Sequence, residues 1–297
     1  MIAITHILCP VDFSESSTRA AAYAIAMAKW YEARLALLHV WVNQGAVDLP
    51  PIVLGADERA QFLDEMRRLS GPHEGVSLDF LVREAPDVPQ EILDQTAALG
   101  VDLLVLGSHG RTGVRRLLLG SVTENLLRRG TVPLMVVPRG APDAKRDGTM
   151  QLERILCPVD FSEGSLAALT YALSIAQESD ADLTVMHAIE IPPELSEHMP
   201  PADFNLDAIR AAAVVASLQR LRDLIPDSAR TFCRIDTIVR EGAAYRQVLQ
   251  VAEERRSDLI VMGVQGRGAL DLLVFGSNTA RLTRAATCPV LVIRQPN

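Results

Sequence analysis

The chain contains two copies of one pattern, and this duplication limits the folds open to it more than any other feature. The segment at 6–17 reads HILCPVDFSESS and returns at 154–165 as RILCPVDFSEGS, an offset of 148 residues. The segment at 102–107 reads DLLVLG and returns at 258–263 as DLIVMG, an offset of 156 residues. The second copy therefore carries about eight extra residues, which fall mainly between its second and third predicted strands.

The length and composition suit two domains, one for each copy. The chain has 297 residues, of which 48% are hydrophobic and 22% charged, as in ordinary globular proteins. A polar segment rich in glycine, proline and charge, GAPDAKRDGTMQ, separates the copies. We therefore predict a first domain over 1–139, a linker over 140–151 and a second domain over 152–297.

Short apolar segments alternate with longer helical patterns in each copy. In the first copy the predicted strands are 5–10, 34–41, 76–82, 102–106 and 132–137, and the predicted helices are 16–31, 56–69, 89–99 and 121–129. Uniformly apolar strands are typical of a parallel sheet covered on both faces. The alternation predicts an α/β fold with right-handed crossovers and a doubly wound sheet. Ligands of such sheets bind beyond the carboxyl ends of the strands, where the strand order reverses.

A glycine pattern follows the fourth predicted strand of each copy. It reads GSHGRTGVRRLLLGS at 107–121 and GVQGRGALDLLVFGS at 263–277. Glycine lets the backbone approach a ligand, and a helix N-terminus offers unpaired N–H groups to phosphate. The pattern therefore predicts a phosphate-binding loop. The alternative is that Gly107 serves a tight turn and Ser121 is a helix N-cap, since SVTE at 121–124 matches a capping box.

Other side chains near these loops have two interpretations each. Asp12 and Asp160 follow the first strands and could accept hydrogen bonds from a nucleoside, or could form ordinary turns before a helix capped by a residue such as Ser14. His39 and His187 lie within apolar strands, where we expect neutral core histidines rather than metal ligands.

The composition argues against several classes of function. A net charge of −8 and 4% aromatic residues disfavour nucleic-acid binding. With no signal-like N-terminus and no apolar segment of spanning length, we expect a cytoplasmic protein with no membrane partner. The four cysteines form no CxxC pair and are expected to be buried thiols. The Walker A and GxSxG motifs are absent, and no catalytic base accompanies both loops.

These motifs resemble the universal stress protein family, in particular the tandem members of its ATP-binding branch. The resemblance rests on ILCPVDFS, which occurs twice, and on the G-x2-G-x9-G-[ST] spacing, and it covers nearly the whole chain. It implies two five-stranded parallel sheets of order 3-2-1-4-5, each binding ATP, with ADP or AMP as alternatives, together with Mg²⁺.

The resemblance also implies which residues contact the adenine nucleotide. In the first copy they are Pro10, Val11, Asp12, Val40, Leu106, Gly107, His109, Gly110, Arg111, Gly120, Ser121, Val122 and Thr123. In the second copy they are Pro158, Val159, Asp160, Ala188, Met262, Gly263, Gly266, Arg267, Gly276, Ser277, Asn278 and Thr279. The second copy departs from the family at Val264–Gln265, where Ser–His is usual, and at Ala188 and Asn278.

The family further implies pairing through the fifth strands, here 132–137 and 289–293, because an exposed apolar edge strand needs a partner. We therefore expect an internal pseudo-dimer of the two domains, with a homodimer as a further option. The expected function is a nucleotide-dependent regulator. The alternatives are a slow ATPase, in which Asp12 or His109 orients water, and an adaptor in which the glycines are only turns.

Overall fold

The computed structural model describes residues 2–42, 54–71, 75–110, 119–144, 150–190, 206–264 and 277–294. The first half contains β1 (His6–Pro10), α1 (Glu15–Tyr31), β2 (Arg34–Trp41), α2 (Ala56–Ser70), β3 (Ser77–Glu84), α3 (Val88–Ala98), β4 (Leu103–Gly107), α4 (Ser121–Arg129) and β5 (Leu134–Val137). All predicted elements of this copy are present, with ends that differ by one or two residues.

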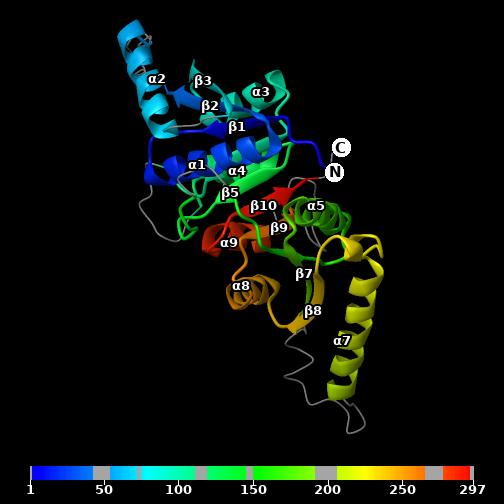
Figure 1. The fold of residues 1–297 in the computed structure, drawn as a ribbon. Helices are drawn as coiled ribbons and strands as arrows, with labels where there is room; N and C mark the ends of the chain where they lie inside the picture. Colours follow the sequence, from blue (N-terminus) through cyan, green and yellow to red (C-terminus); the bar gives the residue numbers. More distant parts are fainter. Residues whose placement is uncertain are drawn as a thin grey trace.

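The second half repeats this order. It contains β6 (Arg154–Pro158), α5 (Glu163–Ser179), β7 (Asp182–Ile189), α7 (Leu206–Asp223), the 3-10 turn η1 (Ala229–Thr231), β8 (Ile235–Glu241), α8 (Ala244–Glu254), β9 (Leu259–Gly263), α9 (Ser277–Ala285) and β10 (Val290–Ile293). Figure 1 shows α2 and α7, the helices that follow the second strand of each half, at opposite ends of the molecule.

The strands of both halves form one ten-stranded sheet of order β3-β2-β1-β4-β5-β10-β9-β6-β7-β8. Within each half the strands are parallel and follow the expected order 3-2-1-4-5, so the α/β doubly wound fold is confirmed. The halves meet where β5 pairs antiparallel with β10, with Met135 opposite Leu291. The strand order reverses between β1 and β4, and again between β6 and β9.

The sheet separates two hydrophobic cores, each of which extends through both halves. On β1, Ile7 and Cys9 enter one core and Leu8 enters the other, as strand alternation requires. Helices α1, α2, α5 and α7 pack in the first core, and α3, α4, α8 and α9 in the second. The four cysteines are buried free thiols, as predicted, and burial raises the pKa of Cys288 to about 12.

The described part of the predicted linker packs on α1. Ala141 is buried, and the Tyr23 hydroxyl donates a hydrogen bond to the Pro142 carbonyl at 2.9 Å. Arg19 pairs with Asp143 at 3.1 Å. The connection is thus held against the first half, while the boundaries 1–139, 140–151 and 152–297 stay a prediction. Among the described residues, no helix combines the length and apolarity needed to cross a bilayer.

Candidate functional site

The turn after β1 aims one oxygen of Asp12 at the glycine loop. Its other oxygen, Oδ1, accepts hydrogen bonds from the Ser14 backbone N–H at 3.1 Å and the Ser14 hydroxyl at 2.6 Å. The Ser14 hydroxyl in turn accepts from the Ser17 N–H at 3.2 Å and caps α1. The turn-and-cap interpretation therefore holds for Ser14 and for Oδ1. Oδ2 lies so near Gly110 that a Cβ on this glycine would stand 2.7 Å from it.

The second half repeats this turn after β6. The Oδ1 atom of Asp160 accepts from the Ser162 N–H at 3.0 Å and from the Ser162 hydroxyl at 2.5 Å. Ser162 caps α5 by accepting from the Ser165 N–H at 3.3 Å. Because two segments 148 residues apart form the same bonds, the turn is a property of the repeated sequence rather than of one site.

Each turn contains an aromatic residue in the left-handed backbone region. Phe13 has φ 63° and Phe161 has φ 64°, values that are rare for bulky side chains. Such strain persists only where surrounding contacts fix it, and it is concentrated at functional sites. Here the following helix helps to fix the first turn, since the Ser17 hydroxyl accepts from the Asp12 N–H at 3.3 Å.

The histidines of β2 and β7 contact backbone carbonyls next to these turns. The Nδ1 atom of His39 lies 2.8 Å from the Val11 carbonyl, and that of His187 lies 2.7 Å from the Val159 carbonyl. A carbonyl only accepts, so Nδ1 carries the proton in both. His39 is buried and its predicted core role is confirmed, whereas His187 is half-buried.

The first glycine of each loop allows β4 or β9 to approach a helix. A Cβ on Gly107 would lie 2.3 Å from the Ser16 hydroxyl oxygen and 2.7 Å from the Ser16 carbonyl oxygen. A Cβ on Gly263 would lie 2.6 Å from the carbonyl carbon of Gly164. The structure thus gives these glycines a packing role that the tight-turn and ligand interpretations did not include.

The alternative interpretation, that Ser121 is the N-cap of α4, is wrong. Gly120 is the N-cap, with φ −61° and ψ 140°, and Ser121 is the first helical residue. The Gly120 N–H donates to the Ser108 carbonyl at 2.9 Å and so closes the base of the loop. Within the described part of the chain, no side chain makes a cap hydrogen bond at this helix. The N–H groups of its first turn therefore face the carboxyl edge of the sheet without a side-chain cap.

Threonine in the first turn of each of these helices points inward. The Thr123 hydroxyl donates to the Gly107 carbonyl at 2.8 Å, and the Thr279 hydroxyl donates to the Val264 carbonyl at 3.1 Å. Both side chains are buried, so only their backbone N–H groups stay candidates for a ligand. The halves differ beside this contact, because the Ser108 hydroxyl lies 2.8 Å from Nδ1 of His109, whereas Val264 is apolar and buried.

The remaining predicted residues lie at the same edges. Pro10 and Val11, Val40 and Leu106 lie at or next to the ends of β1, β2 and β4, and Val122 lies in the first turn of α4. Pro158, Val159, Ala188, Met262, Ser277 and Asn278 occupy the equivalent places in the second half. Arg111, Gly266, Arg267 and Gly276 lie outside the described residues.

Ser108 and Ser17 were not predicted as site residues. Both lie in the segments that the repeats single out, Ser108 in the glycine pattern and Ser17 at the start of α1, but the residue type alone does not indicate the bonds that they make. Among the described residues, no three His, Cys, Asp or Glu side chains cluster as metal ligands.

Comparison with known proteins gives matches along the whole chain. The universal stress protein family matches residues 3–138 and again 151–294. A universal stress protein of Mycolicibacterium smegmatis is 26% identical, with 97% of this chain and 96% of the relative covered. One of Mycobacterium tuberculosis H37Rv is 28% identical, with 96% and 95% covered. The crystal structure of a universal stress protein from Archaeoglobus fulgidus shares the fold, with a TM-score of 0.65 and 20% identity over 97% of this chain and 98% of that one.

Proposed function

Because the chain belongs to the universal stress protein family, with one family domain in each half, we propose that it is a stress-response regulator that binds an adenine nucleotide in both halves. One observation carries the proposal. Asp12, Gly110 and the uncapped start of α4 meet at the edge where the strand order reverses, which is the usual ligand position in doubly wound sheets.

The residues present fit a nucleoside polyphosphate. The Asp12 carboxylate is held by its turn through Oδ1 and has Oδ2 beside Gly110, and an ionised carboxylate has acceptor capacity for ribose hydroxyls. The backbone at Val40 would meet adenine. The first-turn N–H groups of α4, from Ser121 to Thr123, would bind phosphate oxygens. ATP is the first candidate, with ADP and AMP as alternatives.

The second half has the same arrangement of proposed nucleotide-binding positions, with different side chains at some of them. Asp160 occupies the same turn, and Ala188 and Asn278 stand in place of Val40 and Val122. Mg²⁺ would accompany the nucleotide through phosphate oxygens and water, because the described residues supply no carboxylate cluster.

We further propose that the halves act as an internal pseudo-dimer. The pairing of β5 with β10 leaves neither fifth strand with an open edge, so a homodimer would need another surface. Nucleotide binding would then bias the arrangement of the loops at both edges and so control partner contacts.

Isothermal titration with Mg-ATP tests the proposal. The variant Gly110→Ala places a Cβ 2.7 Å from Oδ2 of Asp12, so it should displace this oxygen and weaken binding in the first half, while the second half binds as before. Gly140→Ala is the matched control, because its Cβ would meet no atom closer than 3.7 Å. If the unaltered protein binds no adenine nucleotide below millimolar concentration, the proposal is wrong.

A further inference from the structure

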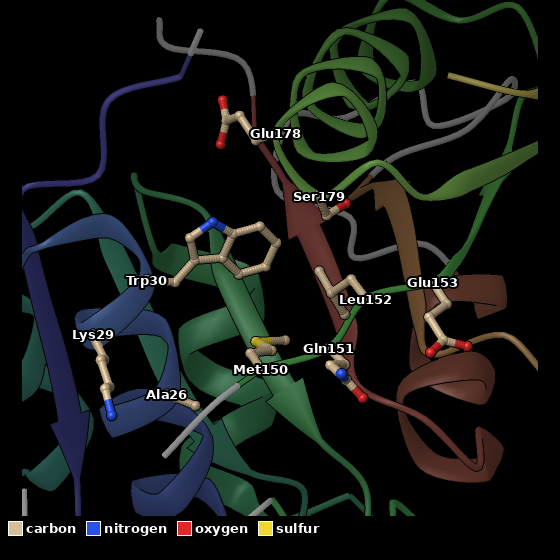
Figure 2. Close-up of a pocket in the computed structure, with 9 residues that line it drawn as sticks. All are labelled: Ala26, Lys29, Trp30, Met150, Gln151, Leu152, Glu153, Glu178 and Ser179. Atoms are coloured by element: carbon tan, nitrogen blue, oxygen red, sulfur yellow. The ribbon is translucent and has the colours of Figure 1, made fainter. Parts of the chain in front are cut away.

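A cavity of about 440 Å³ lies between α1 and α5, and none of its lining residues belongs to either proposed nucleotide site. Figure 2 shows Trp30 and Ala26 from α1, Glu178 and Ser179 from α5, and Met150 and Leu152 from the segment before β6 around it. The volume falls within the range of about 300–1,000 Å³ that is typical of small-molecule sites.

The duplication makes this cavity chemically asymmetric. Trp30 and Glu178 are 148 residues apart, the offset that relates the first two strands of the copies, so they occupy equivalent positions on α1 and α5. One half therefore contributes an aromatic ring and the other a carboxylate to the same space. A dimer of identical halves would place two rings or two carboxylates there.

The Glu178 carboxylate is held by its own helix. Its Oε1 atom accepts from the Ser174 hydroxyl at 2.8 Å, and the Ser174 oxygen accepts from the Ile2 N–H at 3.0 Å. The last turn of α5, which ends at Ser179, adds the partial negative charge of a helix C-terminus. The α5 side of the cavity is therefore negative.

The aromatic side is built from two stacked rings. Trp30 lies on Tyr31 with ring centroids 5.6 Å apart and an interplanar angle of 18°. Burial and then the nearby Glu178 carboxylate raise the pKa of Tyr31 above its ordinary value. The phenol thus stays neutral beside the carboxylate. Met150, Leu152 and Ala26 complete apolar walls.

The other charged groups do not cancel this polarity. Glu153 is paired with Arg154 at 3.1 Å. Lys29 is exposed, and in Figure 2 its ammonium group points away from Trp30 and Glu178.

We propose that this cavity binds a small organic cation, with its ammonium group between the Trp30 ring and the Glu178 carboxylate and its carbon skeleton against Met150 and Leu152. An aromatic face attracts a cation through its quadrupole, and a carboxylate supplies the counter-charge. A bare metal ion would lack a full ligand set here, because no three His, Cys, Asp or Glu side chains cluster among the described residues. An anion would face the carboxylate and the helix C-terminus.

Tryptophan fluorescence offers a direct test, since the chain contains only Trp30 and Trp41. In a Trp41→Phe background, titration with choline should change the Trp30 emission saturably. The uncharged isostere 3,3-dimethyl-1-butanol should bind at least about tenfold more weakly. Glu178→Gln should weaken choline binding about tenfold, whereas Glu163→Gln, at the other end of the same helix, should not change it.

These experiments distinguish choline binding in the cavity from nucleotide binding at the other two sites. An Asp12→Ala, Asp160→Ala double variant should bind choline as before, whether or not nucleotide binding exists. Equal binding of choline and its uncharged isostere, or unchanged affinity in Glu178→Gln, would overturn the cation assignment. No saturable response at tens of millimolar choline, checked by calorimetry on the unaltered protein, would overturn the site.

Discussion

The two halves hold the same strained turn but cover it with different chemistry. In both halves the strand histidine contacts the aromatic ring of the turn, with ring centroids 4.7 Å apart for His39 and Phe13 and 4.6 Å apart for His187 and Phe161. In the first half the cover is Phe62 of α2, whose ring centroid lies 4.5 Å from that of His39. In the second half the guanidinium of Arg220, from α7, lies 3.9 Å above the Phe161 ring. The hydrogen bonds of the turn are nonetheless the same, so the turn does not depend on the nature of its cover.

Some parts of the candidate site recur in both halves, and other parts differ between them. The carboxylate and the serine cap recur in both halves with the same contacts, and the first glycine of each loop approaches the equivalent position of the neighbouring helix, Ser16 or Gly164. The loop side chains differ, because Ser108 contacts His109 whereas Val264 is a buried apolar residue. Among the described loop residues the first half therefore has more polar side chains, and we expect it to hold the tighter nucleotide site.

The largest expected effect comes from the glycines that end β4 and β9. Gly107→Ala and Gly263→Ala should each lower the free energy of unfolding by about 3 kcal/mol, because overpacked cores must shift backbone. Urea denaturation of each variant measures the loss, and Gly140→Ala should be close to neutral.

The two glycines differ in the atoms that an added Cβ would meet. Gly107 would meet the Ser16 side chain as well as backbone, whereas Gly263 would meet only the backbone of Gly164 and Ser165. Adding Ser16→Gly to Gly107→Ala should therefore recover part of the loss and leave the backbone clash at 2.7 Å. A neutral Gly107→Ala would show that β4 does not approach α1 this closely.

The next effect concerns nucleotide affinity. Asp12→Ala should weaken binding in the first half about 10–100-fold, since a hydrogen bond to a charged group contributes about 1.5–3 kcal/mol. Asp160→Ala should affect the weaker site and leave the tighter one. Calorimetric titration of Mg-ATP into each variant distinguishes them, with melting temperatures as a check on folding.

Two results would contradict these expectations. If Asp12→Ala and Asp160→Ala lower the Mg-ATP affinity equally, the differences between the loop side chains do not affect nucleotide binding. ATP turnover that falls with Asp12→Ala would instead favour the slow ATPase interpretation.

A smaller effect on stability is expected for the residues that cover the two turns, Phe62 in the first half and Arg220 in the second. Phe62→Ala should cost about 2 kcal/mol, below the 3–5 kcal/mol of a fully buried ring, because Phe62 is only partly buried. Arg220→Met, which keeps the apolar stem and removes the charge, should cost about 1 kcal/mol or less. Urea denaturation gives both values. A larger loss for Arg220→Met would mean that the second turn does depend on its cation.

The sequence predicted the repeated features well and the local bonding poorly. Alternation of apolar strands with helical segments was enough for the fold, because both faces of the sheet are buried along its central strands β4, β5, β9 and β10, which are uniformly apolar. Asp12 and Gly110 were placed at one edge because parallel strands end together. Each of these inferences depends on a period or a spacing.

The features that the sequence did not predict depend on atomic detail. SVTE satisfies a capping box on paper, but the chain enters α4 one residue earlier, because the Gly120 N–H closes the loop on Ser108. The bond from the Thr123 hydroxyl to the Gly107 carbonyl could not be read from the sequence, and the proposed contact of Thr123 with phosphate stays a prediction for its backbone N–H. The cavity beside Trp30 had no sequence signal, since Trp30 and Glu178 meet only when the two halves share a sheet.

The smallest expected effect is a pH dependence at Asp102, next to the start of β4 in the first half. The Oδ2 atom of Asp102 accepts from the Thr5 N–H at 2.7 Å, the Thr5 hydroxyl at 2.6 Å and the His6 N–H at 3.0 Å. Burial alone would raise the pKa of Asp102, but these hydrogen bonds outweigh it and lower that pKa. The corresponding Asp258 makes the equivalent backbone bonds, accepting from the Glu153 N–H at 3.0 Å and the Arg154 N–H at 2.9 Å, and has an ion pair with the Arg154 guanidinium at 3.1 Å in place of the hydroxyl bond.

A lowered pKa means that ionised Asp102 stabilises the folded state above the unfolded pKa of about 4, and that this stabilisation disappears as the pH falls through the folded pKa. Asp102→Asn should therefore lower the free energy of unfolding near pH 7 by about 1 kcal/mol or less, because the group is partly solvated. The difference from the unaltered protein should shrink below pH 4. Asp79→Asn, which removes an exposed pair with Arg34, is the control. A difference that grows on acidification would show that Asp102 is protonated in the folded protein, and the two halves would then differ in charge at this edge as well as in partners.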